Sequence, residues 1–218
     1  LSTLIRKTFD NNFLHLLAQH LYLVFVSLAL AIMIGLPLGV VCFYKPHIGL
    51  AILSVTGVFQ TIPSLALLAF LISLFGVIGT IPAIAALFLY GLLPIIQSTH
   101  AGMSEVSKSM RQAACALGLS GYDQFRYIEL PLAFNVILSG IKVSAVLTVG
   151  NATLAAFVGA GGFGERIAQG LALNDTSMLL AGAIPSALLA LFIQYFLYFI
   201  LQFLVVLNGV LKCFSLLL

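Results

Sequence analysis

Long apolar segments alternate with short polar intervals along nearly the whole chain. The apolar segments cover about residues 16–43, 48–74, 83–102, 132–158 and 178–207. Each is long enough to cross a bilayer, which takes about 20 residues of helix, and a helix satisfies its own backbone hydrogen bonds in lipid. The pattern therefore predicts an all-α integral membrane protein, with about five transmembrane helices in one domain over residues 1–218.

Helix-breaking residues interrupt several of these segments. Gly35 and Pro37 weaken the helix in the first segment, and Pro94 does so in the third. A polar group at 60–64 interrupts the second segment. A turn is expected at 76–82, and a Gly-rich loop at 159–175 between the fourth and fifth segments.

The longest polar interval, Met110–Pro131, predicts a two-helix segment over about 109–131, between the third and fourth spans. Ser109 and Gln112 have the spacing of a capping box, which starts a helix. Small residues then continue this helix, and Gly118 is expected to end it in a left-handed conformation. The small side chains would let another protein approach its backbone closely.

A second short helix is expected after Gly118. Ser120, followed three residues later by Asp123, has the pattern of a helix start. Pro131 disfavours helical backbone at the residue before it, which predicts a boundary at Leu130.

Composition supports a membrane protein and excludes several other classes. Hydrophobic residues make up 62% of the chain and charged residues 7%, against about 25% charged in soluble domains. The net charge of +3 is too small to indicate nucleic-acid binding. The three cysteines, Cys42, Cys115 and Cys213, lack metal or redox spacing and are expected to be ordinary small helix residues.

The distribution of Lys and Arg predicts the orientation. If the 109–131 interval is cytoplasmic, six basic residues lie inside and three outside, which favours an external amino terminus. The inner six are Lys45, Lys108, Arg111, Arg126, Lys142 and Lys212. The outer three are Arg6, Lys7 and Arg166. Lys142 lies some way into a span and is expected to snorkel towards the inner surface.

Sequence motifs for chemistry are weak or absent. Residues 159–164 fit G-x-G-x-x-G, but an apolar span precedes them, so a tight external turn is expected rather than a dinucleotide site. No G-x-x-x-x-G-K-[ST] occurs, so a nucleotide site would have to come from another chain. The apolar segments contain no carboxylate, which argues against a proton- or sodium-driven carrier. The histidines, His15, His20, His47 and His100, lack metal spacing and are expected to have interfacial or capping roles.

Two clusters of uncharged polar residues lie inside the spans. The first contains Gln60, Thr61, Pro63 and Ser64, and the second contains Thr148, Asn151 and Thr153 beside Gly150. Such residues either join helices by hydrogen bonds or line a polar path, since irregular backbone is tolerated beside cavities. Both interpretations stay open, and neither cluster indicates what would pass.

The 109–131 interval resembles the signature loop of the permease subunits of ABC importers. That loop has the pattern Glu-Ala-Ala, three residues, Gly, nine residues, Ile-x-Leu-Pro. This chain has Gln112-Ala113-Ala114, Gly118 and Ile128-Glu129-Leu130-Pro131 at the same spacing, with Gln in place of Glu at 112. The segments 60–66, 87–94, 157–164 and 172–191 are also similar to permeases for glycine betaine, carnitine and choline.

The resemblance implies an importer of quaternary ammonium osmoprotectants in the bacterial cytoplasmic (inner) membrane. A second permease copy and cytoplasmic ATPase subunits, which bind the ATP and Mg, would complete it; this chain would be no enzyme and hold no cofactor. An external substrate-binding protein, separate or fused beyond residue 218, would deliver the solute. The implied ATPase-coupling residues are Arg111, Gln112, Ala113, Ala114, Leu117, Gly118 and Pro131.

The remaining implied sites are less defined. The two polar clusters are candidates for the translocation path, and Gly161, Gly162, Phe163 and Gly164 are candidates for contact with the binding protein. Alternatives are an ABC permease for another solute such as methionine, a channel or secondary carrier, and an intramembrane enzyme. The last would need paired catalytic groups within the spans, and none stands out.

Overall fold

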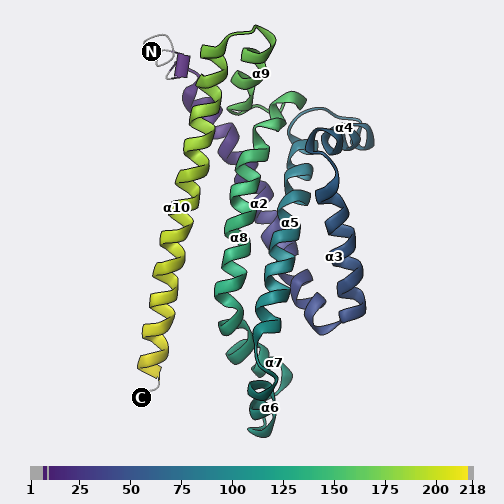
Figure 1. The fold of residues 1–218 in the computed structure, drawn as a ribbon, viewed down its shortest axis with the longest axis vertical. Helices are drawn as coiled ribbons and strands as arrows, with labels where there is room; N and C mark the ends of the chain where they lie inside the picture. Colours follow the sequence, from purple (N-terminus) through teal and green to yellow (C-terminus); the bar gives the residue numbers. More distant parts are fainter. Residues whose placement is uncertain (1–6, 9, 216–218) are drawn as a thin grey trace.

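The computed structural model describes residues 7, 8 and 10–215, with side chains described up to residue 200. Within this part of the chain every regular element is helical. Four stretches are long and apolar enough to cross a membrane: Phe13–Tyr44 (α2), Thr80–Glu105 (α5), Gly121–Ala152, which ends in α8 (Leu130–Ala152), and Thr176–Ile200 of α10 (Thr176–Ser215). The prediction of an all-α membrane protein is confirmed (Figure 1).

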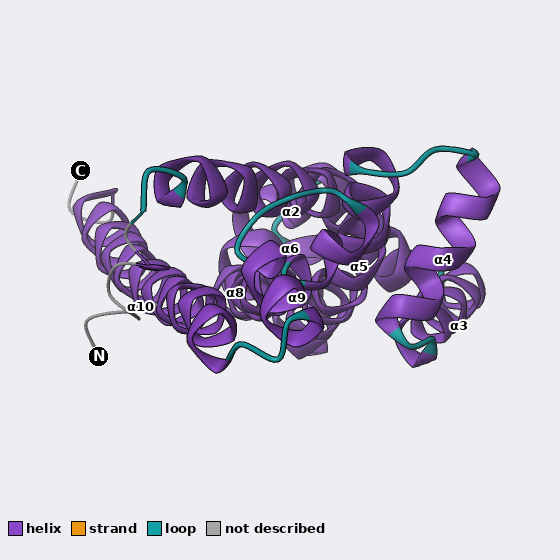
Figure 2. Ribbon diagram, turned by 90° about the horizontal axis from the view of Figure 1, so that it is seen from above, coloured by secondary structure: helices purple, strands orange, loops and turns teal. Residues whose placement is uncertain are grey.

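Helices α2, α5 and α8 form the centre of the bundle, with α10 on one side and α3 (Pro46–Thr61) on the other (Figure 2). Small residues let the central helices approach, because lipid provides no hydrophobic drive for helix association and close packing has to do so. A side chain at Gly140 would overlap Ser98 of α5, for example. Beside it, Ser144 of α8 donates a hydrogen bond to the carbonyl oxygen of Gly91, at 2.8 Å.

The second predicted span is broken. Helices α3 and α4 (Ser64–Phe75) meet at 105°, and only as a pair do they have the length of a span. Pro63 has no N–H to continue the helix, and Tyr90 stabilises the break because its hydroxyl donates to the Ile62 carbonyl oxygen. Gln60 in turn donates to the Tyr90 carbonyl oxygen at 3.0 Å. The predicted interruption is confirmed, and it takes the form of a sharp bend.

The segment predicted as a Gly-rich loop, 159–175, contains a helix, α9 (Gly164–Ala172). The 3-10 helix η2 (Leu154–Val158), which follows α8, forms the end of the predicted fourth span. Helix α9 and the start of α2 lie at one end of the bundle, here called the α9 end (Figure 1). The short helices α6 (Lys108–Ala116) and α7 (Gly121–Gln124) lie at the opposite end, here called the coupling end, as does the last turn of α10.

Candidate coupling surface and translocation path

Helix α6 starts two residues earlier than predicted. The Ser107 hydroxyl accepts the Met110 N–H at 3.3 Å and is therefore the cap, whereas Ser109 lies inside the helix. Both serines have the chemistry of a cap, and the end of α5 decides between them, because Val106 is already extended when the chain reaches Ser107. The predicted capping box at Ser109 and Gln112 is wrong.

Helix α6 ends as predicted. Gly118 has φ +78°, and its N–H donates to the Cys115 carbonyl oxygen at 3.0 Å. The Leu119 N–H donates to the Ala114 carbonyl oxygen at 3.1 Å, which completes a Schellman motif. A Cβ at Gly118 would meet nothing within 4 Å, so glycine is needed here for its backbone conformation and not for space.

The second short helix also starts as predicted, since the Ser120 hydroxyl accepts the Asp123 N–H at 3.2 Å. The boundary predicted at Leu130 is wrong, because this residue has helical angles of φ −62° and ψ −46°. A π-helical segment, η1 (Phe125–Glu129), leads into α8, and the Leu130 N–H bonds the Phe125 carbonyl oxygen. This wider turn changes the hydrogen-bond spacing just before Pro131, so the helix continues through the proline.

Small side chains cover the exposed surface of α6. Gln112, Ala113, Cys115 and Ala116 are exposed, while Ala114 faces inward and is buried. Two large apolar side chains are exposed beside them: Leu117 at the end of the helix, 81% exposed, and Met110 in its first turn, 45% exposed. The face therefore offers close access to backbone between two apolar side chains, a shape suited to a groove in another protein.

Arg111 of α6 points back into the bundle. Its Nε lies 3.0 Å from Oε1 of Glu129, its Nη2 donates to the Met103 carbonyl oxygen at 2.6 Å, and its guanidinium lies 4.5 Å from the ring centre of Phe43. Glu129 is 3% exposed and also accepts the hydroxyl hydrogen of Tyr44. Sequence reasoning missed Glu129, Phe43 and Tyr44, because nothing in the sequence pairs residues so far apart.

The two polar clusters predicted as path candidates meet at one place. Ser64 of the first and Asn151 of the second line a narrow cavity beside Tyr90, together with apolar side chains of α4, α5 and η2. Its free volume of about 10 Å³ is close to that of one water molecule. A single copy in this conformation therefore contains no open path at this point.

The other members of the clusters are bonded within the protein. The hydroxyls of Thr61, Thr148 and Thr153 each donate to a carbonyl oxygen of their own helical turn, at 2.8 Å. Gln60 joins α3 to α5, as described above. The interhelical interpretation therefore fits Gln60, while Ser64 and Asn151 line the narrow cavity, and their role in a path stays a prediction.

The glycine turn after η2 packs against the protein's own helices. Gly161, Gly162, Phe163 and Gly164 are all buried. The Gly162 N–H donates to the Gln19 side-chain oxygen at 3.0 Å. Gly164 lies against the Thr153 carbonyl group at the end of α8, and Gly182 of α10 lies against the Phe163 carbonyl oxygen, so an added side chain at either position would overlap backbone. Contact of these four buried residues with a binding protein would require the turn to open.

Phe163 is the largest buried side chain of this turn. It is 1% exposed and lies between the rings of Phe13 and His20, with centroid distances of 5.5 and 5.6 Å. His20 is fully buried within α2, and its Nε2 lies 3.2 Å from the Val149 carbonyl oxygen. An interfacial or capping role, as predicted for the histidines, is therefore wrong for His20, which packs inside the bundle.

Ion pairs fasten the amino-terminal segment to α9. Arg166 is buried, donates to the Thr8 carbonyl oxygen at 2.7 Å and pairs with Asp10. Lys7 pairs with Asp175, and this hydrogen bond lowers the pKa of Asp175 below its ordinary value. Arg6 lies outside the described residues.

The remaining basic side chains gather at the coupling end, apart from Lys142. This lysine lies within α8, and its Nζ lies 5.4 Å from the ring centre of Tyr198 on α10. The side chains of Lys212 and Cys213 lie outside the described residues. Cys42 is buried and Cys115 exposed, and no group of His, Cys, Asp and Glu in the described part of the chain could hold a metal.

Comparison with known proteins identifies relatives along most of the chain. Residues 27–207 match the family described as binding-protein-dependent transport system inner membrane component. The chain is 39% identical to the glycine betaine/carnitine/choline transport system permease protein OpuCB of Bacillus subtilis (strain 168), over 87% of each chain. It is 37% identical to the osmoprotectant import permease protein OsmW of Salmonella typhimurium, over 83% of this chain and 86% of the relative.

Solved structures share the fold. The inward-facing MetNI methionine ABC transporter superimposes with a TM-score of 0.76 at 22% identity, over 88% of this chain and 98% of the other. An amino acid ABC transporter crystallised with histidines gives 0.68 at 18% identity, over 85% and 89%. At these identities the likeness concerns the arrangement of helices and not the solute.

Proposed function

Because the chain belongs to the family of binding-protein-dependent transport system inner membrane components, we propose that it is the permease subunit of an ATP-driven importer of glycine betaine, carnitine or choline. The observation that carries this proposal is the 39% identity, along 87% of both chains, to a permease named for these three solutes. The exposed small-residue face of α6 supplies the surface that an ATPase partner needs.

The energy source would lie in partner subunits. ATPase chains would bind ATP and Mg at the coupling end, and this chain would supply the path and no bond chemistry. An extracytoplasmic binding protein, separate or fused, would deliver the solute. A second permease copy would form the other wall of the path, since the space beside Ser64 and Asn151 in one copy, about 10 Å³, is too small for such a solute.

The proposed orientation places the coupling end in the cytoplasm and the amino terminus outside. Lys45, Lys108, Arg111 and Arg126 belong to the coupling end, against Lys7 and Arg166 at the α9 end. An excess of Lys and Arg on the inner side is the usual pattern of membrane proteins. The location would be the bacterial inner membrane.

The proposed mechanism is alternating access driven by ATP. Closure of the ATPase dimer would shift α6, and the continuous helix from η1 through Pro131 into α8 would carry this shift into the membrane. ATP would thereby favour one of two arrangements of the bundle. Gln112 is exposed on α6 and faces the partner where the family pattern has Glu, so this contact would be uncharged.

Reconstitution tests the proposal. The permease would be purified with its neighbouring ATPase and binding protein, placed in liposomes, and supplied with labelled glycine betaine, carnitine, choline and methionine. The expected result is ATP-dependent uptake of at least one of the first three. Uptake of methionine alone would show that methionine is the solute, in place of the three proposed. Uptake that persists without any ATPase would falsify the proposal of an ATP-driven importer and indicate a channel or carrier.

A further inference from the structure

One guanidinium and one carboxylate connect distant parts of the chain where α6 joins the bundle. Arg111 comes from α6 and Glu129 from the end of η1, with Nε and Oε1 3.0 Å apart. Glu129 is 3% exposed, and a carboxylate so well covered is stable only with partners. Its other oxygen, Oε2, accepts the hydroxyl hydrogen of Tyr44, the last residue of α2.

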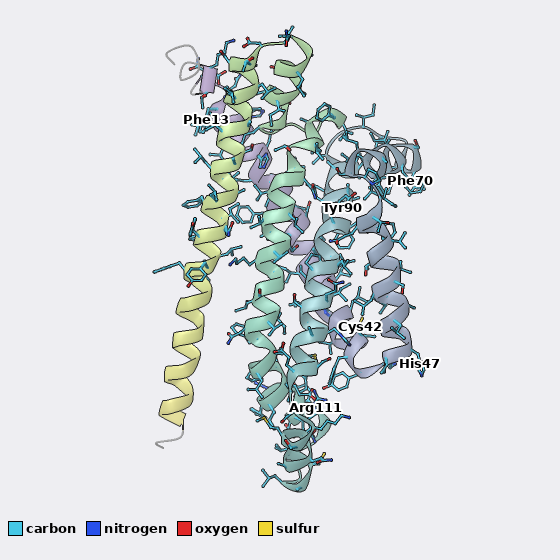
Figure 3. All side chains as sticks on the ribbon, viewed as in Figure 1. Phe13, Cys42, His47, Phe70, Tyr90 and Arg111 are labelled. Atoms are coloured by element: carbon cyan, nitrogen blue, oxygen red, sulfur yellow. The ribbon has the colours of Figure 1, made fainter. Side chains whose placement is uncertain are left out.

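Arg111 extends this network to two more helix ends. It donates to the carbonyl oxygen of Met103, near the end of α5, and covers the ring of Phe43 in α2. Figure 3 labels Arg111 where the short helices meet the lower ends of the long ones. The ends of α2 and α5 and the entry to α8 therefore share one cluster, here called the Arg111 cluster: Phe43, Tyr44, Met103, Arg111 and Glu129.

The segment that carries Glu129 has free space beside it. A half-open groove of about 630 Å³ is lined almost entirely by apolar groups of α2, α5, η1 and α8, including Pro37, Val40, Phe125, Leu130 and Phe134. Close-packed interiors resist movement because any shift displaces neighbouring atoms. The wide turn of η1 faces this space, so η1 has room to change its pitch when α6 moves.

The three helix ends depend on the cluster to different degrees. Backbone connects α6 directly to α5 and, through α7 and η1, to α8. Helix α2 has no such connection, since Tyr44 lies 85 positions from Glu129 in the chain. Helix α2 packs along α5 in the bundle, and the contacts of Phe43 and Tyr44 with Arg111 and Glu129 add a direct link between the end of α2 and α6.

We propose that Arg111, Glu129 and Tyr44 are positioning residues that transmit the movement of the coupling helix to the first span. This inference rests on the proposed function, because it assigns a route to the movement that an ATPase would cause. Glu129 holds the α6 side of the cluster through its charge, and the Tyr44 hydroxyl attaches α2 to it.

The test compares uptake with ATP hydrolysis in liposomes that contain the permease, its ATPase and its binding protein, with labelled glycine betaine, carnitine and choline as probes. Glu129→Gln is expected to co-purify the ATPase and hydrolyse ATP, but to lower the solute taken up per ATP by about fivefold or more. Tyr44→Phe, which keeps the ion pair, is expected to lower the same ratio. Glu105→Gln, an exposed carboxylate at the end of α5, is the matched control and should leave it unchanged.

The outcomes are distinguishable. Normal uptake per ATP in both Glu129→Gln and Tyr44→Phe overturns the inference and leaves the proposed function standing. If Glu129→Gln fails to assemble, the double variant Arg111→Gln/Glu129→Gln is tested, because it also removes the arginine charge that the single variant leaves unpaired. Normal uptake per ATP in the double variant also overturns the inference. A wild-type complex that binds no ATPase or takes up none of the three solutes refutes the proposed function itself, and the inference with it.

Discussion

Two nine-residue helices, α6 and α9, lie at opposite ends of the bundle and differ in how far the rest of the protein covers them. Helix α9 follows a turn of buried glycines and is held against the amino-terminal segment by the buried Arg166. Helix α6 ends at a glycine with open space around it and leaves most of its surface exposed. The difference shows that glycine allows close packing at the α9 end and a left-handed turn in open space at the coupling end.

The same contrast holds for the arginines of the two helices. Arg166 is nearly fully covered and ties α9 to residues 8 and 10, so that end behaves as part of the core. Arg111 is tethered inward from a helix that otherwise faces solvent. A helix exposed on its outer face and attached on its inner face is suited to receive a partner and pass its movement on.

The largest expected effect is at the α9 end. Gly164→Ala places a Cβ against the Thr153 carbonyl oxygen, which is backbone and cannot move aside. The change should destabilise the protein by about 3 kcal/mol or more, the upper part of the range for overpacking. Thermal unfolding in detergent measures it. Gly121→Ala at the coupling end, where a Cβ meets nothing within 4 Å, is the control; equal melting temperatures for the two variants would contradict the contrast.

A smaller loss is expected from Arg166→Met. The variant removes the hydrogen bond to the Thr8 carbonyl oxygen and the ion pair with Asp10, at a cost of about 2 kcal/mol, as for hydrogen bonds to charged groups. Arg126→Met removes an exposed side chain and should change stability by less than about 0.5 kcal/mol. The same melting experiment compares them, and a result in which Arg126→Met is the more destabilising would reverse the assignment of core and surface.

Gly118→Leu sharpens the comparison because its effect on function should exceed its effect on stability. A left-handed conformation costs a residue with a Cβ about 1–2 kcal/mol. The strained turn should shift α6 and lower both ATPase co-purification and solute uptake. Asparagine tolerates this conformation, so Gly118→Asn should retain both. Unchanged uptake by Gly118→Leu would exclude α6 as the lever.

The smallest effect is a dependence on pH at the α9 end. The hydrogen bond from Lys7 lowers the pKa of Asp175, so the folded state favours the charged carboxylate. This stabilisation is present above the ordinary aspartate pKa of about 3.9 and is lost as the pH falls through the lower folded value. The difference in melting temperature between the wild type and Asp175→Asn should therefore shrink as the pH is lowered from about 7 towards about 3. A constant difference would show that the charge of Asp175 contributes nothing.

Local chemistry accounts for the parts of the structure that sequence reasoning predicted. The helix end at Gly118 and the cap at Ser120 depend on groups within a few positions, and both were predicted. Ser109 has Gln112 at capping-box spacing and Ser107 does not, so local chemistry favours the wrong serine, and the end of α5 makes Ser107 the cap. The helical backbone at Leu130 was missed because local rules for proline do not include a π turn before it.

Contacts across the bundle were beyond prediction. Tyr90 supports the break at Pro63, Gln19 accepts the Gly162 N–H, and Glu129 receives Tyr44 and Arg111. Each joins residues that only the packing of helices brings together, and a single sequence contains no signal for such pairs.

The sequence by itself determined the membrane spans, the two short helices at the coupling end and the family resemblance, because apolar length, capping residues and motif spacing are local properties. Only the tertiary structure decided that the second span bends, that the glycine turn is buried, and that Arg111 faces inward. Those features depend on which helices lie side by side. In lipid, each irregular carbonyl and each charge must find its partner on whatever neighbour the packing provides.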